Sequence, residues 1–283
     1  MPNADWMARI KDTKYLPQLA IPGTHDSGAC EYTVKPMTRA QNLSIPDQLT
    51  AGVRALDIRC AATWGSNRLT GSTYNVFHGP FDQGISIATV VTNVVDFLNA
   101  HTDEVVLLLL KQEGGMGDIS ADINQIVNDT LGDKLYKRDN EWKRWPRLGE
   151  CRGKALVLSR LQTPSATHFS TVGWPDNCTN SKVWSREEHY GVRIQDLYKS
   201  PQVAEKRKAV SDALSAAKMA AKNDNQKELY INFTSFVWKP REPVWSGSTH
   251  MTPYLTTLTS GAGVICVDAV TEDLASHIIA MNG

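Results

Sequence analysis

The 283-residue sequence has no net charge and no hydrophobic run long enough to cross a bilayer. Its 30 basic and 30 acidic residues balance, so no overall field draws the chain to nucleic acid or to an anionic membrane. The apolar run VVLLLL at 105–110 is the length of a buried strand. An anion that binds this chain must therefore be met by a local cluster of cations.

Signals for metal binding by cysteines and for export are missing too. The five cysteines show no CxxC pair and no regular spacing, which argues against a zinc framework and predicts buried free thiols. The segment MPNADWMARIKDTKY at 1–15 lacks the basic start and apolar core of a signal peptide. Because no repeat, low-complexity tract or long linker divides the sequence, we expect one domain over residues 1–283.

Short apolar runs alternate with helical patterns along the chain. The runs that predict strands are 18–21, 53–60, 74–78, 104–111, 155–160, 228–234 and 263–270. Helices are predicted over 86–101 and 203–223, the second with an apolar stripe through Val203, Val210, Leu214 and Met219. This alternation predicts an α/β fold with parallel strands and helical crossovers.

Polar residues recur where the predicted strands end. They are His25, Asp26, Asp57, Arg59, His78, Lys111, Arg160 and Asp268. In a closed or nearly closed parallel barrel, the carboxyl ends of the strands meet at one mouth, where such folds place their chemistry. We therefore expect these side chains to converge.

The residue types at this mouth favour one kind of chemistry. The three cations Arg59, Lys111 and Arg160 would repel a metal ion, but they suit a phosphate monoanion. Two histidines with possible carboxylate partners supply a base and an acid. The combination predicts metal-free cleavage of a phosphodiester.

Seven segments of the sequence then occur in the order found in one known family. They are IPGTHDS (21–27), QLTAGVRALDIR (48–59), FHGP (77–80), LLLKQE (108–113), GKALVLSR (153–160), IQDLYK (194–199) and GVICVDAV (263–270). From about residue 15 to about 280 the chain resembles the bacterial phosphatidylinositol-specific phospholipases C, the X-domain-like family. The resemblance implies a single irregular TIM-like (β/α) barrel with mostly parallel strands. It also implies cleavage of phosphatidylinositol to diacylglycerol and inositol 1,2-cyclic phosphate.

The resemblance assigns roles to the two histidines. His25 would be the general base that takes the proton from the inositol 2-hydroxyl, with Asp268 holding its imidazole. His78 would be the general acid that protonates the leaving oxygen, tuned by Asp26.

It also implies that the cation of the site is part of the protein. Arg59, oriented by Asp57, would bind the phosphoryl oxygens where eukaryotic relatives bind calcium. We therefore expect no metal and no cofactor.

Substrate contacts follow from the same resemblance, whereas membrane contacts are predicted from aromatic residues in a rim loop. Lys111, Arg160 and Asp196 would hydrogen-bond inositol hydroxyls, and Tyr198 would stack on the ring. In the predicted rim loop 236–248, Trp238 and Trp245 beside Lys239 and Arg241 would touch the membrane, and Met37 and Trp64 lie in other predicted rim loops. The expected partners are phosphatidylinositol in membranes or micelles and inositol phosphate products, without nucleic acid. We expect a secreted monomer, since bacterial relatives act on lipid outside the cell.

Three alternatives stay open at this point. A glycerophosphodiesterase-like metal enzyme needs clustered glutamates at the mouth, whereas Glu113 is the only obvious candidate glutamate here. A barrel that binds inositol phosphates without turnover would not need both histidines. A glycosylphosphatidylinositol anchor presents the same phosphodiester and could be a second substrate.

Overall fold

The computed structural model of the protein describes residues 3–30, 38–63, 73–115, 117–137, 144–184, 190–199, 201–223, 226–238, 242 and 244–283. In these segments no helix is both long and apolar enough to span a membrane. All five cysteines are buried free thiols, as the sequence predicts.

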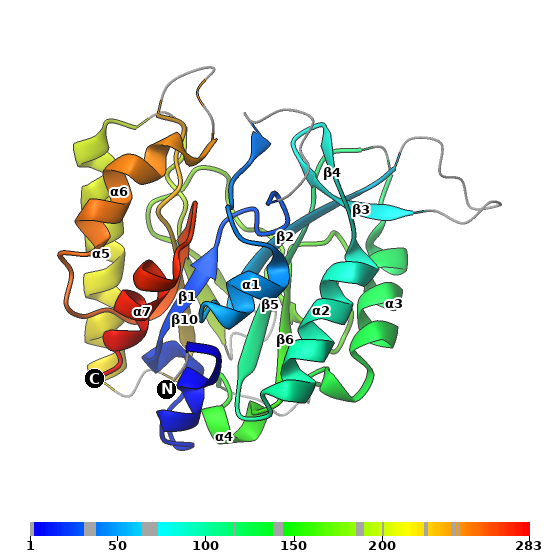
Figure 1. The fold of residues 1–283 in the computed structure, drawn as a ribbon, viewed down its shortest axis with the longest axis horizontal. Coiled ribbons are helices and arrows are strands. Elements are labelled where there is room, and N and C mark those ends of the chain that lie inside the picture. The colour runs from blue at the N-terminus through cyan, green and yellow to red at the C-terminus, as the bar shows by residue number, and fades with distance from the viewer. Residues whose placement is uncertain are drawn as a thin grey trace.

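One eleven-stranded sheet runs through the described part of the molecule, in the order β7-β6-β5-β2-β1-β11-β10-β9-β8, with the hairpin β3-β4 attached to β2. Every neighbouring pair from β7 to β9 along this path is parallel. The strands are β1 (Ala20–Thr24), β2 (Ala55–Ala62), β3 (Tyr74–His78), β4 (Phe81–Ser86), β5 (Val105–Gln112), β6 (Lys154–Ser159), β7 (Phe169–Ser170), β8 (Ser181–Trp184), β9 (Gly191–Gln195), β10 (Glu228–Phe233) and β11 (Gly263–Val267). Within the described residues β7 and β8 do not pair. The sheet is therefore a curled half-barrel, which bears out the predicted irregular TIM-like architecture (Figure 1).

Helices cover the outer face of the curled sheet (Figure 1). They are α1 (Ile45–Thr50), α2 (Ile87–Ala100), α3 (Ser120–Leu131), α4 (Leu148–Cys151), α5 (Val203–Lys222), α6 (Ser248–Leu255) and α7 (Glu272–Ala280), with 3-10 turns η1 (Asn3–Arg9), η2 (Leu16–Gln18), η4 (Gly132–Lys134) and η5 (Val244–Gly247). The hydroxyls of Ser86 and Thr271 accept hydrogen bonds from the first turns of α2 and α7. These caps explain where the two helices begin.

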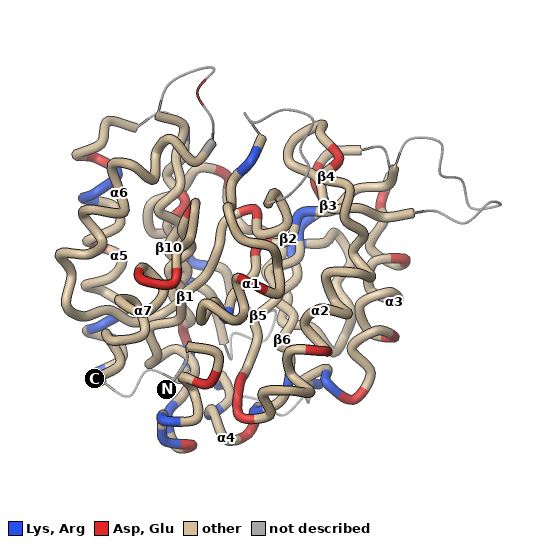
Figure 2. Tube along the Cα trace, viewed as in Figure 1, with Lys and Arg blue, Asp and Glu red and all other residues tan. Residues whose placement is uncertain are grey.

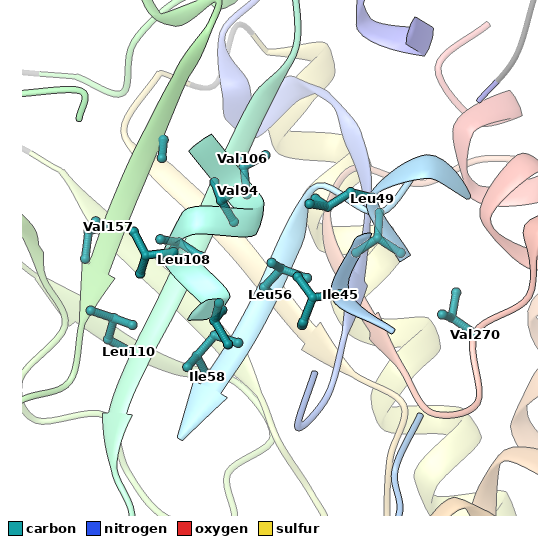
Figure 3. Close-up of a cluster of buried hydrophobic side chains, with 14 of the residues drawn as sticks. Ile45, Leu49, Leu56, Ile58, Val94, Val106, Leu108, Leu110, Val157 and Val270 are labelled. Atoms are coloured by element: carbon teal, nitrogen blue, oxygen red, sulfur yellow. The ribbon is translucent and has the colours of Figure 1, made fainter. Parts of the chain in front are cut away.

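Alternate residues of each central strand pack into two separate cores. In β5, Leu108 and Leu110 face the helices, whereas Leu107 and Leu109 face the barrel interior. Figure 3 shows the helix-side core, in which the labelled side chains of β2, β5 and β6 lie with those of α1, α2 and the loop after β11: Ile45, Leu49, Leu56, Ile58, Val94, Val106, Leu108, Leu110, Val157 and Val270. Both faces of the sheet are thus covered, as expected for parallel strands.

The seven predicted strands and both predicted helices are present, but one orientation is wrong. β3 is antiparallel to β2, with Cys60 opposite Val76 and Ala62 opposite Tyr74. Because β2 continues past its parallel neighbours and β3 returns along it, His78 still comes back to the level of Ile58 at the mouth.

Four strands and one helix face were not predicted correctly. The short strands β4, β7, β8 and β9 lack a long apolar run. On α5 the apolar stripe ends at Ala217, which is buried, whereas Met219 is 66% exposed. Five residues after Leu214 a helix has turned about 140° beyond one full turn, so Met219 leaves the stripe.

Charged side chains of both signs are spread along the chain rather than gathered on one side in this view (Figure 2). Positive and negative side chains are therefore intermixed in the structure, as their equal numbers are in the sequence. At the barrel mouth several charged side chains are buried together.

Candidate active site

The charged residues that follow the strands continue the interior face of the barrel up to its mouth. On β5, β6 and β11 the residue two positions after the last inward apolar side chain is charged: Leu109 is followed by Lys111, Leu158 by Arg160 and Cys266 by Asp268. Since side chains alternate along a strand, these charges point the same way as the interior core. They surround a cavity of about 260 Å³.

The structure brings all ten predicted catalytic and inositol-binding residues to this cavity. The residues that line it are His25, Arg59, His78, Lys111, Arg160, Asp196 and Tyr198. The other three are the carboxylates Asp26, Asp57 and Asp268, which lie behind the lining and are at most 2% exposed. Cationic and imidazole groups thus face the cavity, and buried carboxylates hold them from behind.

His25 follows β1 and pairs with the residue that follows β11. Its Nδ1 lies 2.8 Å from Oδ1 of Asp268, and its backbone N–H donates to the carbonyl of Val267 at 3.0 Å. Asp26 and Ala269, one residue after each partner, have φ values of 43° and 47° in the left-handed region. These sparsely populated conformations turn the chain immediately after each side chain. An Nδ1–H donated to Asp268 leaves Nε2 of His25 as the ring nitrogen that can accept a proton.

Two carboxylates control the protonation of His25. Burial alone would lower the pKa of this imidazole, but Asp26 and Asp268 outweigh burial and raise it to about 9. The free protein therefore holds His25 protonated at neutral pH.

His78 approaches the same point from the end of β3. Its Nδ1 donates to the carbonyl of Thr38 at 2.7 Å, so Nε2 faces the site. Nε2 lies 3.5 Å from Oδ2 of Asp26, and Nε2 of His25 lies 3.3 Å from the same oxygen. The two imidazoles thus converge on one carboxylate oxygen.

Arg59 binds two buried carboxylates at once. Its Nε lies 2.9 Å from Oδ1 of Asp26, and its Nη2 lies 3.0 Å from Oδ2 of Asp57. Burial would raise the pKa of Asp26, but Arg59, together with His25 and His78, lowers it to about 2. Asp26 therefore stays ionised, and its carboxylate is contacted by the Arg59 guanidinium and by both imidazoles.

The opposite wall of the cavity carries the remaining cations. Nζ of Lys111 pairs with Oε2 of Glu113 at 2.7 Å. The guanidinium of Arg160 lies over the ring of Trp174, 4.3 Å from its centroid, an arrangement that fixes its plane. Both side chains are held in place without filling the cavity.

Tyr198 is held by an aspartate of a neighbouring loop. Its hydroxyl donates to Oδ1 of Asp176 at 2.7 Å, and burial together with Asp176 raises its pKa to about 12. Asp196, two residues earlier, is 8% exposed and lines the same wall. Tyr198 is therefore a neutral side chain at every physiological pH.

The segment 38–41 joins both histidines, and the sequence analysis did not identify it. Besides the Thr38 carbonyl that holds His78, the side-chain amide of Gln41 donates to the carbonyls of His25 and Val267 at 2.7 and 2.8 Å. Its Oε1 accepts from the backbone N–H of Val270 at 3.1 Å. The fully buried Gln41 thus ties the loop that carries His25 to the loop that carries Asp268.

Glu113 and Asp176 also line the cavity and were not predicted as site residues. Glu113 lies two residues after Lys111, so the two-residue period of β5 could have identified it. Asp176 lies in an irregular loop between β7 and β8, where no periodic signal exists.

The two tryptophans predicted to meet membrane have different surroundings. Trp245, in η5, is 36% exposed. Trp238 is half-buried, and its ring lies 4.2 Å from that of His250. Met37, Trp64, Lys239 and Arg241 lie outside the described residues.

The donor set at this site does not fit a divalent metal ion. Of the residues that the structure describes, one group could bring three ligand atoms within 4.8 Å of one another: His25, Asp26 and Asp57. Arg59 already binds both of these carboxylates, and His25 is paired with Asp268. A metal ion there would meet a fixed guanidinium, which repels it.

Comparisons with known proteins agree with this geometry. Residues 20–161 match the family described as phosphatidylinositol-specific phospholipase C, X domain. The 1-phosphatidylinositol phosphodiesterase of Listeria monocytogenes is 29% identical, over 98% of this chain and 84% of that protein. The enzyme of the same name from Staphylococcus aureus is 24% identical, over 82% of this chain and 74% of that protein. A solved structure of the Staphylococcus aureus phosphatidylinositol-specific phospholipase C shares the fold with a TM-score of 0.82 at 21% identity, over 100% of this chain and 98% of that one.

The raised pKa of His25 predicts a loss of stability at alkaline pH. The protonated imidazole stabilises the fold fully below about pH 6.5, its unfolded value, and this contribution is lost as the pH rises through about 9. The free energy of unfolding should fall by up to roughly 3 kcal/mol over this range, and the His25→Ala variant should lack this decrease. Denaturant titrations at several pH values test the prediction, and an equal decrease in the variant would contradict it.

The contacts of Gln41 predict a specific effect on His25. Gln41→Leu should destabilise the fold by about 2–4 kcal/mol, because it leaves buried backbone groups without partners. It should also lower the pKa of His25, since the loops that carry His25 and Asp268 are no longer joined. An NMR titration of the His25 ring measures this.

Gln48 provides the matched control for Gln41. It is equally buried, accepts from the hydroxyl of Thr24 and donates to the carbonyls of Ser27 and Leu43, but among the described residues it makes no hydrogen bond to the loop that carries Asp268. Gln48→Leu should destabilise the fold to a similar degree and leave the His25 pKa near 9. Equal pKa changes in both variants would show that Gln41 acts only through stability.

Proposed function

Because the chain belongs to the family of phosphatidylinositol-specific phospholipase C X domains, we propose that it cleaves phosphatidylinositol into diacylglycerol and inositol 1,2-cyclic phosphate without a metal ion. The observation that carries the proposal is the convergence of two imidazoles and one guanidinium on Asp26. His25, His78 and Arg59 all lie within 3.5 Å of its carboxylate. A phosphodiester placed in the cavity beside them meets a base, an acid and a fixed positive charge together.

The two histidines divide the proton transfers. Nε2 of His25 accepts the proton of the inositol 2-hydroxyl, and the oxygen so released attacks the phosphorus. As the bond to the glycerol oxygen breaks, Nε2 of His78 donates a proton to that oxygen. Attack from within the substrate exploits proximity, and each proton transfer contributes on the order of 10²–10⁴ in rate.

The cations of the cavity handle the negative charge. Arg59 is held by Asp26 and Asp57, so its guanidinium is already oriented when charge develops on the phosphoryl oxygens. Such a preorganised group needs little rearrangement during the reaction.

The opposite wall supplies groups for the inositol ring. Lys111, Arg160 and Asp196 offer hydrogen-bond donors and acceptors to several hydroxyls, and the ring of Tyr198 offers an apolar face. The fixed positions of Lys111 and Arg160 support binding of a polar ring rather than a simple chain.

Exposed apolar side chains support contact with a lipid surface. Among the described residues the exposed large hydrophobics are Phe81, Val172, Val237, Trp245 and Met219. The first four lie on the hairpin after β3 and on the loops after β7 and β10, all at the mouth. A solved structure of the Staphylococcus aureus phosphatidylinositol-specific phospholipase C concerns the modulation of its membrane binding, so that relative binds membranes. We therefore assign the mouth as the membrane-facing side.

Phosphorus NMR tests the proposed reaction. With phosphatidylinositol in detergent micelles and EDTA, the protein should produce the resonance of a five-membered cyclic phosphate. His25→Ala should reduce the rate by about 10²–10⁴, because the 2-hydroxyl loses its base. Cleavage that appears only after a divalent ion is added would instead favour a metal-dependent phosphodiesterase.

The exposed apolar side chains at the mouth predict that vesicle binding can be weakened without an equal loss of catalysis. The double variant Val172→Ala/Trp245→Ala should weaken binding to phosphatidylinositol-containing vesicles several-fold, because it removes exposed apolar surface outside the catalytic cavity. Cleavage of a water-soluble inositol phosphodiester should change much less. Met219→Ala, on the far helix α5, is the control and should leave vesicle binding unchanged. Equal loss of both activities in the double variant would indicate a structural role for the rim.

A further inference from the structure

A second hollow lies beside the catalytic cavity, and the reaction described above does not use it. Its volume is about 650 Å³, within the range of small-molecule sites. It lies between the end of β2, the turn of the β3-β4 hairpin and the loop after β5. Its apolar lining comes from Ala61, Ala62, Phe77, Pro80 and Ile119.

The two hollows meet at shared residues. Gly79 and Glu113 line both of them. Gly79 directly follows His78, the residue proposed to protonate the leaving oxygen. A group attached to that oxygen therefore leaves the catalytic cavity beside Gly79, at the entrance of the second hollow.

The walls of the second hollow are held in place by hydrogen bonds. The side-chain amide of Gln112 donates to the carbonyls of Gly114 and Gly117 at 3.2 and 2.8 Å, which folds the loop after β5 back on itself. The backbone N–H of Gly79 donates to Glu113 at 3.3 Å and fastens the hairpin to the same loop. A preformed hollow costs little ordering when a ligand binds.

Among the described residues, the polar side chains that line the hollow are Thr63, Gln112 and Glu113, and each is already hydrogen-bonded. The second carboxylate oxygen of Glu113 is paired with Lys111 on the catalytic side. A Cβ built on Gly114 or Gly115 would meet no atom within 4 Å. The rest of the described lining is apolar or glycine, and it faces whatever enters beside Gly79.

We propose that this hollow, the leaving-group groove, binds the glycerol backbone and the first methylenes of one acyl chain of the departing diacylglycerol. The proposal rests on the proposed function and adds a subsite for the part of the substrate that the catalytic cavity does not hold. An apolar groove next to the acid suits an apolar leaving group. It would give the enzyme a preference for alkyl chains that does not depend on a membrane surface.

A series of soluble substrates tests the groove. The methyl, butyl and hexyl phosphodiesters of myo-inositol 1-phosphate are used below their micellar concentrations, so no lipid surface contributes. For the wild-type protein, kcat/KM should rise about twofold for each half-buried methylene, or about 30-fold from methyl to hexyl. No rise along the series would overturn the proposal.

Substitution of Ala62 removes the groove without touching the histidines. Ala62→Phe fills the space and Ala62→Glu places a charge in it, and Ala62 is exposed, so both variants should fold. Each should reduce the methyl-to-hexyl ratio to less than about threefold. Ala280→Phe, on an exposed position of α7, is the matched control and should retain the full ratio. An unchanged ratio in both Ala62 variants would refute the groove.

Binding measurements separate this proposal from the proposed function. Calorimetry with the His78→Ala variant measures affinity for the same substrate series in the absence of turnover. If affinity rises with chain length while the wild-type protein cleaves none of the substrates, the groove stands and the proposed function fails. If the wild type cleaves all three substrates equally well, the proposed function stands and the groove fails.

Discussion

The mouth of the barrel depends on one interaction, the binding of two buried carboxylates by Arg59. Asp26 and Asp57 are almost inaccessible to water, and an ionised carboxylate in that position is strongly unfavourable unless it is paired. Arg59 lies within 3.0 Å of both, so removal of the guanidinium would leave Asp57 without its ion-pair partner and Asp26 with only the two imidazoles. The same contacts fix a positive charge beside the cavity, on a side chain whose direction β2 determines.

The opposite end of the barrel shows how differently a structural ion pair is built. Arg54 and Glu104, both fully buried, pair at 2.8 Å, and Arg54 donates further to the carbonyls of Ala4, Leu49 and Val53. Their polar atoms are directed at protein partners and line no described cavity. At the mouth, by contrast, the cations and imidazoles face a cavity, and only the carboxylates are directed inward. A buried ion pair in a functional site leaves one side of the cation free for a ligand, whereas a purely structural ion pair does not.

The sequence predicted the strands and site residues that have a local periodic signal. It did not predict contacts between residues that are far apart along the chain. The run 104–111 predicts β5 because the six consecutive residues 105–110 are apolar, and Lys111 follows from the same two-residue period. Gln41 could not be found this way, because its partners Val267 and Val270 are more than 220 residues away. The antiparallel orientation of β3 could not be predicted either, because the alternation of strands and helices predicts a helical crossover before each strand. Trp238 and Trp245 lie in one loop, and only packing against His250 distinguishes them.

The carboxylates around His25 act on the proposed base in two opposing ways. Asp26 and Asp268 stabilise the imidazolium that forms when His25 accepts a proton, which makes the ring a strong base. The same charges keep the ring protonated in the free protein, so at neutral pH only a small fraction of molecules carries the base in its active form. Arg59 acts in the other direction, because its positive charge lowers the pKa of His25 while it binds Asp26. The position of Asp26 between the guanidinium and both imidazoles therefore sets the balance between base strength and base availability. The protonation of the site cannot be changed at one of these residues without changing it at the others.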